Sequence, residues 1–249
     1  MKLTLVRHAT LVLEYGGRRL LVDPMLGAEG TAPPIEDSPN QRPNPLVPLP
    51  VPADELVRDQ DAVLVTHLHE DHLDPDAERL LDRSLPLVCQ PEDRVDLSDR
   101  GFEDVRPVDA TIDLLGISVS RTAGQHGTGE IGLEMAPVCG FVLSARGEPT
   151  LYIAGDTIWC EEVRDALSVH SPRIVVVNAG GARFNFGDPI TMTPADVVKV
   201  AEATPQDTAV VAVHMEAINH CVDTRADLRA ASSDDRILIP ADGETLELN

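Results

Sequence analysis

The sequence predicts an α/β fold in which two mixed β-sheets pack face to face, with helices on their outer sides. The chain of 249 residues is long enough for one domain with a large core, and its apolar content of 43% is ordinary for a globular protein. The sequence also divides into two similar halves, each with a meander of strands followed by mixed strands and helices. We therefore expect a single domain over residues 1–249.

The first half begins with a β-meander at residues 3–24, in which Gly16 and Gly17 form a turn. Residues 27–52 follow with eight prolines, which restrict the chain without forming helix or sheet, and we expect a loop near the functional site. Asp74 and Pro75 are typical of the N-cap and first residue of a helix. We expect strands at 61–67 and 86–89, and helices at 75–83 and 91–100.

The second half contains β-rich runs first and alternating strands and helices afterwards. We expect strands at 111–116, 117–124, 140–146, 150–156, 173–181, 208–214, 236–240 and 245–249. We expect helices at 160–169, 193–203 and 224–232.

The net charge of −22 excludes some partners, because only two of the twenty basic residues are lysines and no basic cluster is visible. Nucleic acids and anionic membranes are therefore poor partners, and the acidity is typical of a soluble, self-repelling surface, with halophilic adaptation as an alternative. No apolar run approaches the ~20 residues of a membrane span, and the N-terminus lacks the features of a secretory signal. The four cysteines form no C-x-x-C pair. We expect a cytoplasmic protein with reduced cysteines.

A cluster of histidines and acids, "THLHEDHLD", follows the apolar run that ends at Val65. His67 and His69 can point the same way in an extended chain, and Asp71 and His72 come directly after them. Imidazole and carboxylate are the usual ligands of borderline divalent metals. A cation would offset the mutual repulsion that otherwise makes such a cluster costly, so we expect a metal site.

Other predicted strands also end in residues that bind metals. His126 lies between glycines after one strand, Asp156 ends another, and His214 ends a third, with His220 shortly after it. Each could be an ordinary polar residue when taken alone. Because all of them end strands, we expect them to complete the site, with either His214 or His220 as the last ligand.

This arrangement resembles the metallo-β-lactamase superfamily, in which H-x-H-x-D-H is followed by a single histidine, an aspartate in "GDT" and a final histidine. The opening "RHATLVLEYGGRRLLVDPML" is similar to the "GHAT…DP" start of one branch, which contains L-ascorbate-6-phosphate lactonases and phospholipases that hydrolyse N-acylphosphatidylethanolamine. Arg7 stands where that branch has glycine. The resemblance extends from His8 to His214 and implies a four-layer αββα sandwich with metals at one edge.

The resemblance also implies the roles of the ligands. His67, His69 and His126 would hold one metal, Asp71, His72 and His214 would hold a second, and Asp156 would bridge them. Zinc is the expected metal, with manganese or iron as alternatives. A hydroxide shared by the two metals would attack a small ester, lactone or phosphodiester. Asp71 would orient that hydroxide, and His220 is the candidate proton donor or oxyanion contact.

Four further residues have supporting roles in this hypothesis. His8 and Asp23 end strands of the first meander and would orient the ligands by hydrogen bonds. Arg183 and Asn185 lie in a glycine-rich loop before a predicted helix and are candidate substrate contacts. The segment 27–52 would form the opposite wall of the pocket.

Several other functions are compatible with the same scaffold. Diiron flavoprotein oxygen reductases have glutamate where this chain has His69, and they carry a flavin domain for which this chain has no room. Mononuclear iron sulfur dioxygenases share the H-x-H-x-D-H residues and remain an alternative. A nuclease is disfavoured by the acidic charge, and a binding protein without activity is disfavoured by the complete ligand set. We expect a small-molecule substrate, and assembly into a homo-oligomer is compatible with the resemblance.

Overall fold

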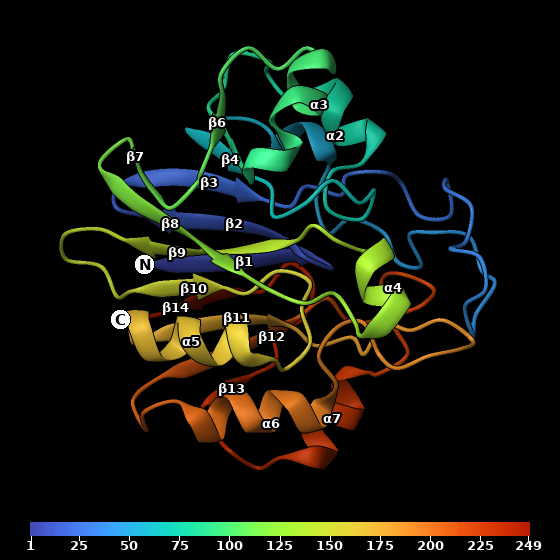
Figure 1. The fold of residues 1–249 in the computed structure, drawn as a ribbon. Helices are drawn as coiled ribbons and strands as arrows, with labels where there is room; N and C mark the ends of the chain where they lie inside the picture. Colours follow the sequence, from blue (N-terminus) through green and yellow to red (C-terminus); the bar gives the residue numbers. More distant parts are fainter.

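The computed structural model describes residues 1–249 and contains two seven-stranded β-sheets that pack face to face (Figure 1). Helices lie on the outer side of each sheet, which confirms the predicted four-layer αββα sandwich. The strand order is β14-β1-β2-β3-β4-β5-β6 in the first sheet and β13-β12-β11-β10-β9-β8-β7 in the second.

The first sheet combines an antiparallel meander with three parallel strands. The meander is closed by Gly16 and Gly17, whose positive φ angles of 59° and 72° suit a tight hairpin. The last strand of the chain, β14, pairs with the first, β1. The strands are β1 (Lys2–Arg7), β2 (Thr10–Tyr15), β3 (Arg18–Val22), β4 (Ala62–Leu64), β5 (Leu87–Cys89), β6 (Val105–Pro107) and β14 (Thr245–Glu247). The helices of this half are α1 (Ala53–Leu56), α2 (Pro75–Leu80), the 3₁₀ helix η1 (Pro91–Asp93) and α3 (Arg94–Asp99).

Along the chain, the second sheet begins with three antiparallel strand pairings, from β7 to β10, and continues with parallel ones. Its strands are β7 (Thr111–Leu114), β8 (Ile117–Ala123), β9 (Cys139–Ser144), β10 (Leu151–Ile153), β11 (Ile174–Asn178), β12 (Ala209–Val213) and β13 (Ile237–Leu238). Its helices are α4 (Gly129–Glu134), α5 (Glu161–His170), α6 (Pro194–Ala203) and α7 (Arg225–Ala231).

Both sheets contribute to one apolar core between them. Along β11, Ile174 and Val176 face this core, whereas Val175 and Val177 pack under the helices of the outer layer. A strand that is buried on both faces reads as a continuous apolar run, which is why "IVVV" occurs here. The two sheets therefore form one unit.

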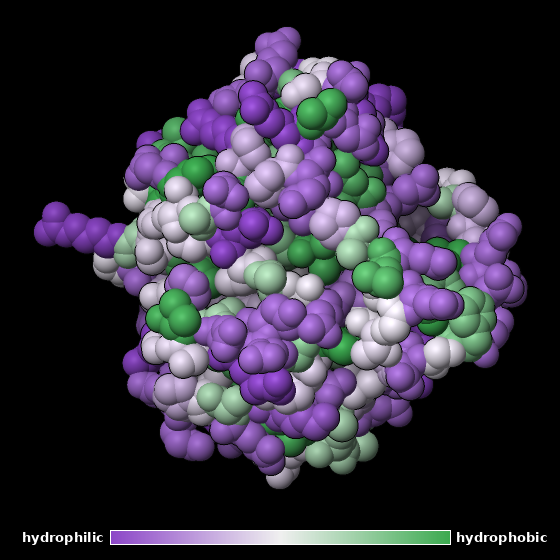
Figure 2. All heavy atoms as spheres, in the orientation of Figure 1, coloured by the Kyte–Doolittle hydropathy of each residue, from purple (hydrophilic) through white to green (hydrophobic).

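The surface is mostly hydrophilic on the face shown in Figure 2, with hydrophobic residues in small groups. No helix of the chain is both long enough and apolar enough to cross a membrane. Both chain ends lie on the side of the molecule opposite the proline-rich segment 27–52, which is drawn in blue at the right of Figure 1.

Candidate metal centre

The predicted metal ligands converge in two adjoining groups where strands of both sheets end. The first group contains His67, His69 and His126, whose ligand nitrogens all lie within 4.8 Å of one another. His67 follows β4, and its Nε2 faces Nδ1 of His69 at 2.9 Å. His126 follows β8 of the other sheet.

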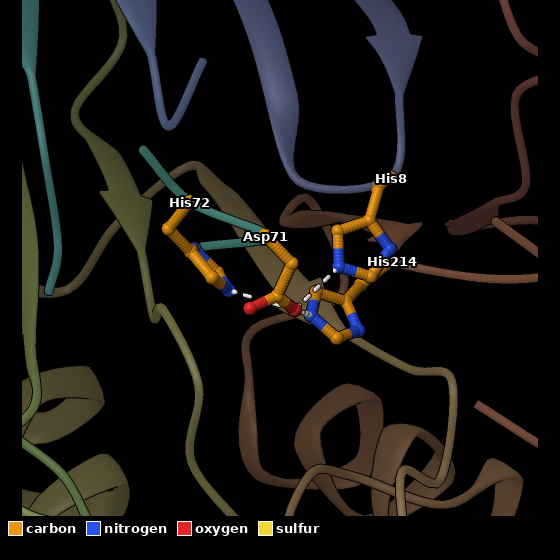
Figure 3. A group of neighbouring side chains, drawn as sticks. All are labelled: His8, Asp71, His72 and His214. Atoms are coloured by element: carbon orange, nitrogen blue, oxygen red, sulfur yellow. Dashed lines mark hydrogen bonds and ion pairs between the residues drawn. The ribbon is translucent and has the colours of Figure 1, made fainter. Parts of the chain in front are cut away.

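The second group contains His8, Asp71, His72 and His214, whose side chains point toward one another around the Asp71 carboxylate (Figure 3). His8 Nε2 lies 2.9 Å from Oδ2 of Asp71, and His214 Nε2 lies 3.5 Å from the same oxygen. His72 Nε2 is 3.7 Å from it. Oxygen and nitrogen atoms of the kind that bind divalent metals are therefore concentrated here.

Asp156 lies between the two groups. Its Oδ2 is 3.3 Å from Nε2 of both His72 and His126, and its Oδ1 is 3.2 Å from Nε2 of His214. Asn178, at the end of β11, donates a hydrogen bond of 2.6 Å to the same Oδ1 and fixes the carboxylate. One carboxylate thus contacts residues of both groups, as a bridging ligand would.

The backbone is strained at three of the positions that build this centre. His8, Asp23 and His214 have positive φ angles of 60°, 43° and 66°, in a region that is uncommon for residues other than glycine. The backbone N–H of His214 also donates to the carbonyl of His8 at 2.9 Å, which joins the two sheets at the site. Such strain clusters at functional sites.

Hydrogen bonds to the second ring nitrogen orient the histidines. His72 Nδ1 lies 2.9 Å from Oδ2 of Asp23, which also accepts hydrogen bonds from Thr66. His126 Nδ1 donates to the carbonyl of Ile190 at 2.8 Å. In both residues the proton is therefore on Nδ1, and the lone pair of Nε2 is directed into the centre.

The chemistry of these atoms fits divalent cations. The Nε2 atoms of His72 and His214 are buried and have no hydrogen-bond partner, a costly arrangement unless something else binds them. Although burial opposes it, the neighbouring imidazoles of His72, His214 and His8 hold the pKa of Asp71 well below its usual range. Burial, with His72 and His69 nearby, lowers the pKa of His67. Ionised carboxylates and a neutral imidazole are the forms that bind metals.

A cavity of about 570 Å³ opens above the centre. His69, Asp71, His126 and Asp156 line it, together with several residues of the segment 27–52. No lysine or arginine lines it. The other lining residues include Met25, Ile35, Pro45, Leu68, Glu70, Asp74, Asp76, Met135, Phe184, Ile190, Ile218 and His220.

The structure separates His214 from His220. His214 belongs to the ligand group, whereas His220 lines the cavity beside it, with its Nδ1 buried and without a partner. Burial lowers the pKa of His220 to about 4, so its ring is neutral near pH 7. His8 Nε2 contacts Asp71, and Asp23 contacts Nδ1 of His72.

The structure does not bring Arg183 and Asn185 to the cavity. The guanidinium of Arg183 pairs with Asp223 at 3.0 Å and lines a separate open hollow beside the start of α6. The amide of Asn185 donates to the carbonyl of Ser38. The neighbouring Phe184 lines the cavity instead. The glycine-rich stretch gives no indication of which of its side chains turns inward, so the sequence did not identify Phe184.

Asn178 was also missed, although a signal for it exists in the sequence. Asn178 is the last residue of β11, which lies between β10 and β12, and candidate ligands follow both of these strands. The carboxyl ends of parallel strands meet at one edge of a sheet. A polar residue at that place can be expected at the site.

Comparisons with known proteins show the family to which the chain belongs. Residues 18–215 match the family model described as the beta-lactamase superfamily domain. The UPF0173 protein YddR of Bacillus subtilis (strain 168) is 38% identical over 98% of this chain and 99% of its own length. The crystal structure of an isothiocyanate hydrolase from Delia radicum gut bacteria superposes with a TM-score of 0.94 and 38% identity, over 100% of this chain and 99% of that one.

The crystal structure of a possible metal-dependent hydrolase from Veillonella parvula DSM 2008 is also similar, with a TM-score of 0.96 and 32% identity. The similarity covers 100% of this chain and 99% of that one. The narrower resemblance to lactonases and phospholipases stays a prediction. From its fold, its cluster of histidines and aspartates and these matches, the chain belongs to the beta-lactamase superfamily and, within it, to the UPF0173 family of metal-dependent hydrolases.

Proposed function

We propose that this hydrolase holds two divalent ions, zinc foremost, and hydrolyses a small uncharged substrate at an electrophilic carbon, in the cytoplasm. The observation that carries the proposal is the buried convergence of ligands from distant segments at the base of one cavity. His67, His69 and His126 would hold one ion, and Asp71, His72 and His214 the other, with Asp156 between them.

The ions would supply two kinds of chemistry when bound, because a divalent cation lowers the pKa of water to about 7 and polarises an electrophile. The chain supplies orientation. Asp71 lines the cavity, remains ionised, and is fixed by its hydrogen bond from His8. Its carboxylate can accept a hydrogen bond from the attacking water and direct it at the substrate.

His220 would stabilise negative charge on the reacting group. Because its pKa is lowered to about 4, it is a neutral N–H donor rather than an imidazolium near pH 7. A donor that is already fixed in a buried site stabilises a developing oxyanion or thiolate more than a donor in water does.

The charge of the cavity favours an uncharged substrate. Phosphate groups are usually bound by arginine or lysine, but none lines this cavity, whereas Glu70, Asp74 and Asp76 do. This disfavours phosphodiesters and nucleic acids and leaves esters, lactones and similar electrophiles. Isothiocyanates belong to this class, and a relative with 38% identity over the whole chain is named for hydrolysing them. An isothiocyanate is therefore the first substrate to test.

A substrate panel tests the proposal with the purified, metal-loaded enzyme. Addition of water to the central carbon of an isothiocyanate gives a thiocarbamate, which splits into a primary amine and carbonyl sulfide. We expect amine release from isothiocyanates, slower or no release from phosphodiesters, and a fall in kcat of about 10²–10⁴-fold in Asp71→Asn. Asp165→Asn, an exposed carboxylate on α5, is the matched control and should behave as wild type.

Two outcomes would contradict the proposal. One is near-wild-type turnover by Asp71→Asn with its metal content unchanged. The other is a protein that hydrolyses none of the substrates, retains one iron per chain, and consumes oxygen with a persulfide, as a sulfur dioxygenase would.

A further inference from the structure

The proline-rich segment 27–52 has no helix or strand, yet buried polar groups attach it to the rest of the molecule. Near its ends, the buried guanidinium of Arg7 donates hydrogen bonds of 2.9 Å to the carbonyls of Met25, Gly27 and Val47. Arg7 is the residue that departs from the "GHAT" pattern of the resembled branch. Its place in the structure explains the departure, because its side chain holds both ends of this segment.

Asn219 fixes the middle of the segment. Its side chain is 1% exposed, and its Oδ1 accepts hydrogen bonds from the backbone N–H of Ile35 at 2.9 Å and the amide of Asn44 at 2.8 Å. Its Nδ2 lies 2.5 Å from both Oγ of Ser38 and the carbonyl of Asn40. The backbone N–H of Asn219 donates to Oδ1 of Asn44 at 2.9 Å. Asn219 thus connects three parts of the segment to the loop after β12.

Part of the surface that this attachment presents to the cavity is apolar. Met25, Ala217 and Ile218 form a small buried cluster, separate from the main cores, and Ile35 and Val47 pack against it. Met25, Ile35 and Ile218 line the cavity, together with Pro45. Asn219 lies between two lining residues, Ile218 and His220. Asn219, which holds this surface in place, is therefore adjacent in sequence to His220, the candidate contact of the reacting group.

We propose that this apolar wall, formed by Met25, Ile35, Pro45 and Ile218, is the subsite that receives the uncharged apolar substituent of the substrate, and that Asn219 sets the size limit by holding the wall in place. The inference rests on the proposed function, since it assigns one end of the substrate to the metals and the other to this wall. A fixed wall discriminates by size, because a substituent that does not fit cannot displace it.

The test compares the metal-loaded wild type with Asn219→Ala. Turnover of methyl isothiocyanate and of phenethyl isothiocyanate gives the size preference, and hydrogen exchange of residues 28–47 reports the attachment. Binding of phenethyl alcohol, an uncharged apolar probe, is followed by ligand-observed NMR and needs no hydrolysis. Gln41→Ala is the matched control, since this exposed amide bonds only within the segment, to Ile35 and Ser38.

We expect Asn219→Ala to exchange faster over residues 28–47 and to bind phenethyl alcohol more weakly. The ratio of kcat/KM between the two isothiocyanates should change about tenfold, the size of a typical pocket discrimination. The metal content should remain close to wild type, which a general structural defect would not allow. Ser38→Ala removes one contact of Asn219 and the bonds of the Ser38 hydroxyl within the segment, and it should show a smaller change in the same direction if Asn219→Ala folds poorly.

These experiments distinguish failure of the subsite assignment from failure of the proposed function. If the wild type binds phenethyl alcohol but hydrolyses no isothiocyanate, the proposed reaction is wrong and the subsite stands. If the wild type hydrolyses both substrates and Asn219→Ala keeps the same size preference, the subsite assignment is wrong. It is also wrong if the wild type hydrolyses both but does not bind the probe.

Discussion

At the scale of single residues, the centre depends on the residues that hydrogen-bond to the candidate ligands as much as on the ligands themselves. The pair of His72 and Asp23 shows this most clearly. The Asp23 carboxylate accepts from Nδ1 of His72 and from the N–H and hydroxyl of Thr66, so it fixes both the tautomer and the loop. The lone pair of Nε2 is left for a metal.

We predict that Asp23→Asn weakens metal binding by about 10–100-fold, the usual effect of removing such a partner. An amide nitrogen facing Nδ1 would favour the tautomer of His72 that carries its proton on Nε2, where no metal can bind. Chelator competition measures the affinity. Asp61→Asn removes a carboxylate that accepts from the backbone of Arg19 away from the centre, and it should bind metal as wild type. Equal affinities in the two variants would refute the role of Asp23.

We predict a pH dependence of stability that originates from His220. Its pKa is about 4 in the folded protein, against an ordinary value of about 6.5, because burial disfavours the charged ring. The unfolded chain therefore binds the proton more readily, and this contribution to stability is present above pH 6.5 and is lost as the pH falls toward 4.

The size of this effect can be measured on metal-free protein by denaturant unfolding. Between pH 7.5 and 5.5 the wild type should lose about 1 kcal/mol more unfolding free energy than His220→Gln, which has no ring to protonate. A pH dependence that is the same in both proteins would show that His220 is not a buried neutral imidazole.

At the scale of elements, the long helices and all strands except β6 could be predicted, because the apolar repeat and the caps that mark them are local in sequence. The N-cap of α2 is Asp74, where the sequence places it, and α6 begins one residue after the predicted start at Thr193. Two short helices, α1 and α4, were not expected. Neither has a side-chain cap, and α4 begins at a glycine and buries no residue, so neither has a sequence signal.

The convergence of the candidate ligands was predictable for a related reason. Residues that end strands are recognisable from the apolar run before them, and parallel strands bring such ends to one edge. The contacts made by segments without a regular repeat of apolar residues were not predictable. Asn219 and Arg7 act through backbone carbonyls of a proline-rich segment, and no pattern in that segment reveals which carbonyls they reach.

A single tyrosine connects the two sheets away from the metal centre, and we predict that its hydroxyl stabilises their packing. Tyr15 at the end of β2 is fully buried, and its hydroxyl lies 3.0 Å and 2.8 Å from the carbonyls of Leu143 and Pro149. Tyr15→Phe should lower the free energy of unfolding by about 1–3 kcal/mol, because it removes a buried donor. Tyr152→Phe is the control, since that buried hydroxyl has no hydrogen bond of good geometry. Equal losses in the two variants would contradict the role of Tyr15.

At the scale of the whole molecule, the metal centre joins segments that are far apart in the chain. The candidate ligands come from the loop after β4 and from the ends of β8, β10 and β12, and His8 of the first meander bonds to one of them. Both sheets therefore depend on the same small group of buried nitrogens and carboxylates. In a chain with a net charge of −22, bound cations would also offset part of the self-repulsion.

The most direct test of this account is the metal content of the chain itself, measured by elemental analysis after purification without added metal and again after saturation and removal of excess metal. The two adjoining ligand groups, with Asp156 between them, predict a saturated value of about two ions per chain, and a loss of at least one in His214→Ala. A saturated value of zero would contradict the assignment of a metal centre. A value that stays at one, and is unchanged in His214→Ala, would contradict the two-ion arrangement.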